Sequence, residues 1–152
     1  MLNKTDLIWI YEKCKDRART MITDQLNGGF QPCVLLRHDI DDDLDKAVRN
    51  AELQFDMSVS ATYFILNTAT YFDNSKEMWD KIRYIQGLGH EVGWHNNSLV
   101  QFKDLVTKEK VNEICDLFRV NGIWLHGSAS HGDSDCRKLG LINYEVFTEC
   151  ES

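Results

Sequence analysis

Apolar positions along this chain alternate between two spacings, one typical of amphipathic helices and one typical of buried strands. From Thr5 to about Leu26 they recur at helical spacing, which predicts a first helix that Asn27-Gly28-Gly29 would end. Cys33–Leu36 is a short unbroken apolar run, which favours a parallel strand buried on both faces. The chain is therefore predicted to begin with a helix followed by a strand.

The same alternation continues through the rest of the chain. Helical spacing covers residues 42–55, 74–88 and a segment that runs to about 120, and strand patterns cover 60–66, 90–95 and 123–125. On the helix over 42–55, the predicted buried face holds Leu44, Ala47, Val48, Ala51 and Phe55. Residues 126–133 are predicted as the loop after the fourth strand, and 144–147 as a weak further strand. Strands that alternate with helices predict an α/β fold with parallel strands.

Charged residues follow the first predicted strand without a spacer. Cys33–Leu36 leads directly into Arg37-His38-Asp39-Ile40-Asp41, and further aspartates come next. Crowded carboxylates repel each other unless a metal ion, a cation or bound protons offset the repulsion, so packing alone does not account for them. Because chemistry in α/β folds collects at the carboxyl ends of strands, we expect Asp39 and Asp41 to form the floor of a functional site. The aspartates at 42–45 are predicted to be solvated residues at a helix start.

Histidines follow the two later strands of the predicted sheet. His95 ends the third strand, and His126 and His131 lie in the predicted loop after the fourth. Because parallel strands bring their carboxyl ends to one side, we expect Asp41, His95 and His131 on one rim of the sheet. Carboxylate and imidazole groups suit a divalent ion such as zinc, which activates water, and a free carboxylate nearby can act as general base. His90, which follows a helix end, is predicted to form structural hydrogen bonds.

Composition and charge narrow the classes of function. At 152 residues the chain predicts a single domain over 1–152, and its 43% hydrophobic and 27% charged content is ordinary for a soluble globular protein. The net charge of -7 and the lack of a basic run argue against nucleic-acid binding. No apolar run is long enough to span a membrane and the first residues lack a secretory segment, so we expect a cytoplasmic protein without membrane attachment. Its five scattered cysteines are then expected to be reduced thiols.

Three motifs carry a resemblance to a known family. Arg37-His38-Asp39-Ile40-Asp41, Ala61–Ile65 and Gly89-His90-Glu91-Val92-Gly93-Trp94-His95 fall in the order and rough spacing seen in polysaccharide deacetylases, the NodB-like carbohydrate esterase family 4. The chain most resembles the divergent branch that has His-Asp-x-Asp where typical members have two adjacent aspartates. The resemblance covers about residues 35–132. It implies an irregular, incomplete (β/α) barrel and a metal-dependent hydrolase that removes an acyl group from a carbohydrate, with zinc as the expected ion.

The resemblance also implies roles for single residues. Asp39 matches the family's catalytic base, Asp41 matches a metal-binding aspartate, and His95 matches the first histidine of a His-x-x-x-His metal pair. Ile40 separates the two aspartates, so an exchange of their roles is the alternative. Leu99 stands where the second metal histidine would be, and His131 is our expected substitute.

Two other functions remain open at this stage. Leu99 favours a catalytically inactive deacetylase-like module that binds a glycan or a protein partner. Hydrolysis of another carbon–nitrogen bond, such as a cyclic amide in a small-molecule substrate, is the third interpretation. The family's usual later strands have no room in 152 residues, and a barrel cut short leaves a strand edge unpaired. We therefore expect either a homo-oligomer or further chain beyond Ser152.

Overall fold

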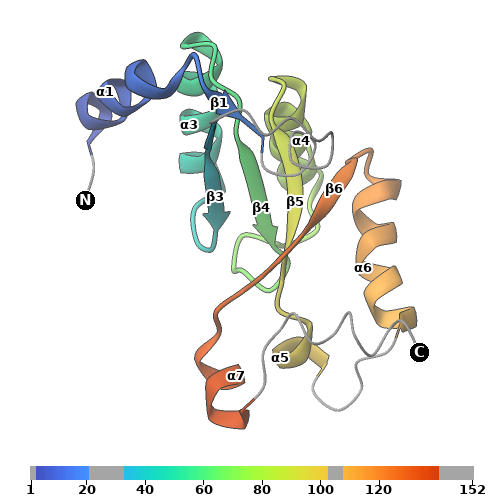
Figure 1. The fold of residues 1–152 in the computed structure, drawn as a ribbon. Coiled ribbons are helices and arrows are strands. Elements are labelled where there is room, and N and C mark those ends of the chain that lie inside the picture. The colour runs from blue at the N-terminus through green and yellow to red at the C-terminus, as the bar shows by residue number, and fades with distance from the viewer. Residues whose placement is uncertain (1–2, 21–32, 103–107, 141–152) are drawn as a thin grey trace.

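The centre of the molecule is a parallel sheet. The structure is a computed structural model that describes residues 3–20, 33–102 and 108–140. Four parallel strands form the sheet in the order β3-β4-β5-β6 (Figure 1). They are β3 Arg37–Ile40, β4 Thr62–Leu66, β5 Glu91–Asn96 and β6 Leu125–Ser130. Each strand pairs with the next one in sequence, and the predicted α/β fold with parallel strands is confirmed.

Helices connect the strands and extend the molecule at both ends. The connecting helices are α3 Leu44–Asp56, α4 Lys76–Gly87 and α6 Lys108–Val120. The others are α1 Lys4–Cys14, α5 Ser98–Phe102 and α7 Ser134–Leu139, and a separate parallel pair is formed by β1 Ala18–Arg19 and β2 Val34–Leu35. Figure 1 shows α5 and α7 beyond the carboxyl ends of the sheet strands. None of the helices within the described ranges has the length and apolar character needed to cross a bilayer.

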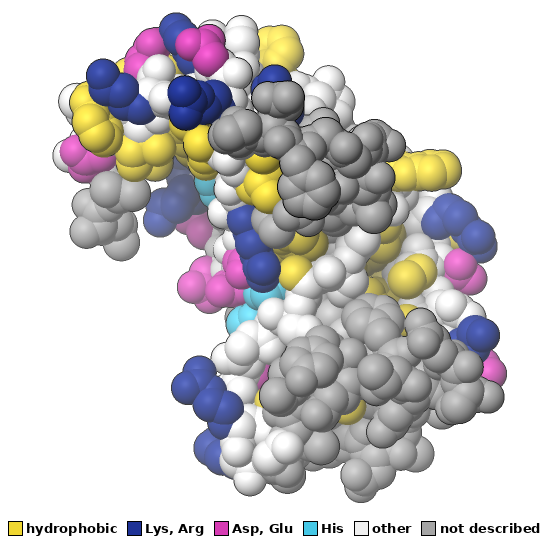
Figure 2. All heavy atoms as spheres, viewed as in Figure 1, with side chains coloured by type: hydrophobic (Ala, Val, Ile, Leu, Met, Phe, Trp, Pro, Cys, Tyr) yellow, Lys and Arg dark blue, Asp and Glu magenta, His cyan; other side chains and the backbone are white. Residues whose placement is uncertain are grey.

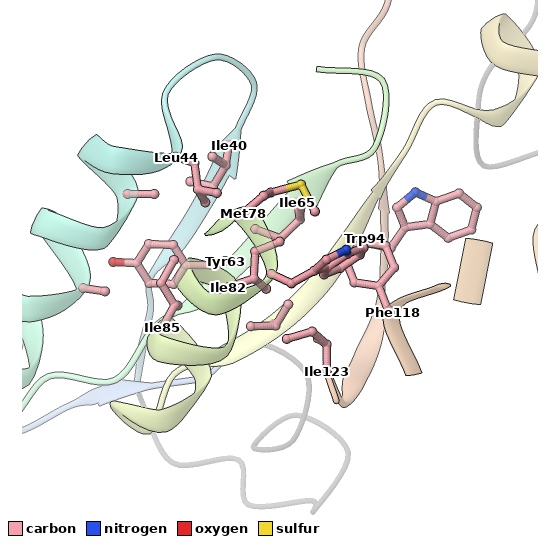
Figure 3. Packing of buried hydrophobic residues seen from close by; sticks show 14 of the residues in the cluster. Ile40, Leu44, Tyr63, Ile65, Met78, Ile82, Ile85, Trp94, Phe118 and Ile123 are labelled. Carbon is pink, nitrogen blue, oxygen red and sulfur yellow. The ribbon is translucent and has the colours of Figure 1, made fainter. Parts of the chain in front are cut away.

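The main hydrophobic core lies between the sheet and its connecting helices (Figure 3). Strand residues alternate between the two faces of a sheet. Tyr63 and Ile65 of β4 and Trp94 of β5 therefore point into this core, where they meet side chains of the helices. The core members labelled in Figure 3 are Ile40, Leu44, Tyr63, Ile65, Met78, Ile82, Ile85, Trp94, Phe118 and Ile123. The residues between them on each strand face away from the helices, and they include the candidate functional side chains.

Side-chain caps explain where the connecting helices begin. The Asp43 carboxylate accepts a hydrogen bond from the Lys46 amide at the start of α3, and the Ser75 hydroxyl accepts one from the Met78 amide at the start of α4. Each cap satisfies a backbone N–H that has no partner within its helix. The prediction that aspartates at 42–45 mark a helix start is therefore confirmed for Asp43.

The first predicted helix was too long. The first predicted strand is present as Val34–Leu35, but it is not buried on both faces and belongs to the small separate sheet. Within the described residues α1 ends at Cys14, and Ala18–Arg19 pairs with Val34–Leu35; residues 21–32, with the predicted glycine stop, lie outside the described part. Ala18 is buried, so an apolar residue that fits a helical pattern also serves a strand. The strand of the main sheet is Arg37–Ile40, so Asp39 lies within it rather than after it.

Two further predictions were wrong for reasons of packing. The fourth strand was expected over 123–125 and a loop over 126–133, but β6 runs from Leu125 to Ser130 and contains His126. Its small residues have low strand propensity and owe their conformation to pairing with β5. On α3 the apolar Phe55 is 55% exposed, whereas its neighbour Gln54 is fully buried. Gln54 is buried because it hydrogen-bonds the half-buried His38 and the buried Tyr63, which overrides the hydrophobic pattern. The predicted strand at 144–147 lies outside the described residues.

Candidate metal centre

The spacing of the two aspartates places their side chains on one face of the sheet. Ile40 points into the helical core, so Asp39 before it and Asp41 after it point to the opposite face. Arg37 shares that face, and its guanidinium binds both carboxylate oxygens of Asp39, with Nε–Oδ1 at 2.6 Å and Nη2–Oδ2 at 2.9 Å. An intervening apolar residue is thus what lets both carboxylates reach the same site.

The structure brings Asp41, His95 and His131 together at the carboxyl ends of three strands. Asp41 follows β3, His95 is the penultimate residue of β5, and His131 follows β6. One ligand atom from each lies within 4.8 Å of the others. His95 Nε2 is 3.6 Å from Asp41 Oδ1, His131 Nδ1 is 3.6 Å from the same oxygen, and the two nitrogens are 3.1 Å apart. A His-Asp-His cluster within metal-binding distance therefore exists on the predicted rim.

These distances test whether one ion fits the cluster. A single point lies about 2.0 Å from all three atoms, and roughly 2.0–2.2 Å is the usual length of Zn–N and Zn–O bonds. Two imidazoles and one carboxylate are also a ligand set that zinc accepts in catalytic sites, where a further position stays open for water. The residues present fit a divalent ion of this kind.

The hydrogen bonding of His95 prepares one of its nitrogens as a ligand. Its Nδ1 donates to the Ala129 carbonyl oxygen at 3.0 Å, because a carbonyl only accepts, so the lone pair of the neutral ring resides on Nε2. Burial lowers the pKa of His95 and favours this neutral form. Metal-binding histidines commonly donate their other nitrogen to a backbone carbonyl in this way. The β5–β6 pairing that places Ala129 opposite His95 thus fixes the ligand orientation.

Asp39 stands beside the cluster. Its Oδ2 lies 3.6 Å from His95 Nε2, while Arg37 holds both of its oxygens. The Arg37 guanidinium in turn lies over the Phe64 ring, 4.9 Å from its centroid. Gly93 makes room for that ring, because a Cβ at this position would lie 2.5 Å from Phe64 Cε1. A glycine on β5 therefore determines where Phe64, Arg37 and Asp39 can lie.

Tyr71 fixes the strand ends that carry the site. Its hydroxyl donates to the Ile40 carbonyl at 2.7 Å and accepts from the Leu66 amide at 3.1 Å, so it joins the ends of β3 and β4. Ile40 precedes Asp41, which places this bridge directly behind a candidate ligand. Tyr71 lies in an irregular segment and was not predicted from the sequence. The Arg37–Asp39 pair was not predicted either, although the two-residue spacing of Arg37 and Asp39 on a strand is a signal for it.

The remaining predicted residues lie as follows. Leu99 is buried on α5, and the structure places His131, not a residue of α5, beside His95. His90 Nε2 lies 3.0 Å from the Ala51 carbonyl oxygen of α3, as expected of a structural histidine. His126 is not part of the cluster. Figure 2 shows histidine and acidic side chains together at the surface, where the outline of the molecule is indented next to α7.

No family model matches this chain, and no curated protein or solved structure matches it either. The resemblance to polysaccharide deacetylases stays a prediction, as do the roles of the single residues. The chemistry that follows is inferred from the side chains of the site.

Proposed function

We propose that this chain is a metal-dependent hydrolase of the deacetylase type, which removes an acyl group from a carbohydrate with water activated at a divalent ion, zinc. One observation carries the proposal: Asp41, His95 and His131 offer three donor atoms around a single point at zinc-bond distance, with the Asp39 carboxylate beside them. The order and spacing of the three sequence motifs support the deacetylase type and the incomplete (β/α) barrel that goes with it.

The proposed roles of the residues follow from their contacts. An ion held by Asp41, His95 and His131 would polarise the substrate carbonyl and lower the pKa of water. Asp39 acts as general base and accepts a proton from the attacking water. Arg37 holds the Asp39 carboxylate in one orientation through two hydrogen bonds, which a proton acceptor at a fixed position requires. The carboxylate of Asp41, close to half exposed, leaves a side of the cluster open to substrate.

The geometry favours this assignment of the two aspartates over its exchange. Both carboxylates approach His95 Nε2 to 3.6 Å, but Asp41 Oδ1 also lies 3.6 Å from His131 Nδ1. Both oxygens of Asp39 are already engaged by Arg37. Asp41 is therefore the better ligand, which leaves the role of base to Asp39.

Measuring zinc stoichiometry and acyl release on matched variants tests the proposal. Asp41→Asn and His95→Ala should lose zinc and activity together, because a neutral amide or a methyl group is a poor substitute for the ligand. Asp39→Asn should keep zinc while turnover on an acetylated sugar falls by about two to four powers of ten, the usual contribution of a positioned base. Asp42→Asn, next to the site but outside the cluster, is the matched control and should keep both. Full zinc content in the Asp41 and His95 variants would exclude this site as the metal centre.

A catalytically inactive binding module is the second candidate, and the buried Leu99 at the expected histidine position favours it. Such a module would bind a glycan or a protein partner on the same surface. It is separated from the hydrolase by a screen of acetylated sugars and cyclic amides. Because a binding module need not hold zinc, less than stoichiometric zinc together with no turnover of any of them would support the module, and release of acetate would exclude it.

A further inference from the structure

The segment that carries His131 is attached to the sheet by two hydrogen bonds beyond the end of β6. The His131 amide donates to the Asn96 carbonyl oxygen at 2.8 Å, and two residues later the Asp133 carboxylate accepts from Asn97 Nδ2 at 3.0 Å. Asn96 and Asn97 are both buried at the end of β5. Two residues span only about 7 Å of chain, so fixing both ends of this segment restricts where the imidazole of His131 can lie.

The amide of Asn97 joins three loops that follow neighbouring strands. Its Nδ2 carries two hydrogens and lies 3.1 Å from Thr68 Oγ1, after β4, and 3.0 Å from Asp133 Oδ2, after β6. The other oxygen of Asp133 accepts the Asp135 amide at 2.8 Å and so caps α7. One buried side chain thus ties the loops after β4, β5 and β6 at the end of the sheet where the cluster lies.

We propose that Asn97 is a positioning residue of the candidate metal centre, which holds the His131 segment so that its imidazole stays beside that of His95. The inference rests on the proposed function, because it assumes that His131 is a ligand. It explains how a chain with Leu99 at the expected histidine position obtains a ligand from another strand. The effect of Asn97 passes through Asp133 and the backbone to His131.

Exchanging the two partners of this hydrogen bond tests the proposal. Asn97→Asp places a second carboxylate against that of Asp133 and removes the donor. In the double variant Asn97→Asp/Asp133→Asn, the amide at 133 donates to the carboxylate at 97, and the Thr68 hydroxyl can donate there too. The amide oxygen at 133 still caps α7, because asparagine is as good an N-cap as aspartate. The two hydrogen bonds that the side chain at 97 makes with positions 68 and 133 are then restored with donor and acceptor reversed.

The readout is the affinity for Zn²⁺ alone, measured by competition with a chromophoric chelator, together with thermal unfolding of the metal-free protein. Asn97→Asp should weaken zinc binding by about 10–100-fold, the usual effect of losing an outer-shell partner, and the double variant should return to within about threefold of wild type. Asp133→Ser keeps a hydroxyl that caps α7, but its side chain is too short to reach Asn97. It should therefore weaken zinc binding by a similar factor. This variant takes the place of Asn97→Asp if Asn97→Asp does not fold.

Asn121→Asp is the matched control. Asn121 Nδ2 donates to the Leu117 carbonyl at 2.8 Å at the end of α6, so this variant also loses an amide hydrogen bond and gains a charge. It should lower the unfolding temperature without changing zinc affinity. His131→Ala distinguishes a failure of the proposed metal centre from a failure of the proposed role of Asn97. If His131→Ala binds zinc as wild type does, the metal centre itself is wrong. If His131→Ala loses zinc while Asn97→Asp and Asp133→Ser keep it, or the double variant stays as weak as the single one, Asn97 is not a positioning residue.

Discussion

Acid should destabilise this protein through His38, whose ring lies in a hydrogen-bond network beneath α3. Gln54 Nε2 lies 2.8 Å from His38 Nε2, and Gln54 Oε1 accepts the Tyr63 hydroxyl at 2.6 Å. Asn50 Nδ2 lies 3.3 Å from the same ring nitrogen. Amide nitrogens only donate, so His38 Nε2 must be an unprotonated acceptor. Burial, and to a smaller extent the neighbouring His90, lowers the pKa of His38 from 6.5 to about 4.

The size of the loss in stability follows from the lowered pKa of His38. Because the folded pKa lies below the unfolded one, only unfolded molecules bind a proton between about pH 6.5 and pH 4, and stability falls as the pH is lowered through this window. At pH 4.5 the loss from His38 alone is about 2 kcal/mol relative to pH 7, since each pKa unit corresponds to about 1.4 kcal/mol. Burial also lowers the pKa values of His90 and His95, so they add to the loss in the same direction.

Urea unfolding of the metal-free protein at pH 7 and pH 4.5 isolates the contribution of His38. His38→Gln keeps an acceptor oxygen near the position of Nε2 but cannot titrate. The variant should be less stable than wild type at pH 7, because its flexible side chain packs less well. It should lose about 2 kcal/mol less than wild type between the two pH values. Equal losses in both proteins would refute the argument that His38 is held neutral by its surroundings.

Three further predictions concern the site and its support. Gly93→Ala should destabilise the protein by about 1–3 kcal/mol in thermal unfolding, because the new Cβ would overlap the Phe64 ring. Gly87→Ala is the control: a Cβ at this helical position has nothing within 4 Å, so the change should be neutral or stabilising. Tyr71→Phe removes both hydrogen bonds between the ends of β3 and β4. It should lower the free energy of unfolding by about 1–3 kcal/mol and also weaken zinc binding. Unchanged zinc affinity would mean that these hydrogen bonds do not support the site. Zinc at 100 times its dissociation constant should raise the free energy of unfolding by about 2.7 kcal/mol, and a chelator should reverse this; no zinc-dependent change in stability would contradict a folded-state metal centre.

The sequence predicted which residues converge because convergence depends only on topology. Once strands alternate with helices, their carboxyl ends share a side, so Asp41, His95 and His131 lie on one rim of the sheet whatever the exact strand limits are. The first and last residues of a strand depend on the neighbouring strands that it pairs with. β6 consists largely of small residues that the pairing with β5 makes extended, so its length left no hydrophobic signal.

The other features that the sequence did not predict depend on tertiary hydrogen bonds. Gln54 replaces Phe55 in the core because His38 and Tyr63 need a polar partner that no local pattern reveals. Tyr71 and Asn97 act across loops separated by many residues, and a single sequence does not show which loops meet. The metal identity, the substrate and the predicted homo-oligomer stay predictions.

The sequential order of the strands has a consequence for biosynthesis. Each strand of the sheet is added beside the strand made just before it, so the sheet can grow from β3 outward as the chain leaves the ribosome. His131, 36 residues after His95, arrives only with the last strand of this sheet. A nascent chain that has formed β3, β4 and β5 would hold two of the three candidate donors, so the proposed centre would bind zinc only weakly at that stage. Tight binding of an ion would therefore begin only when β6 has joined the sheet, so metal binding would show that these four strands have assembled.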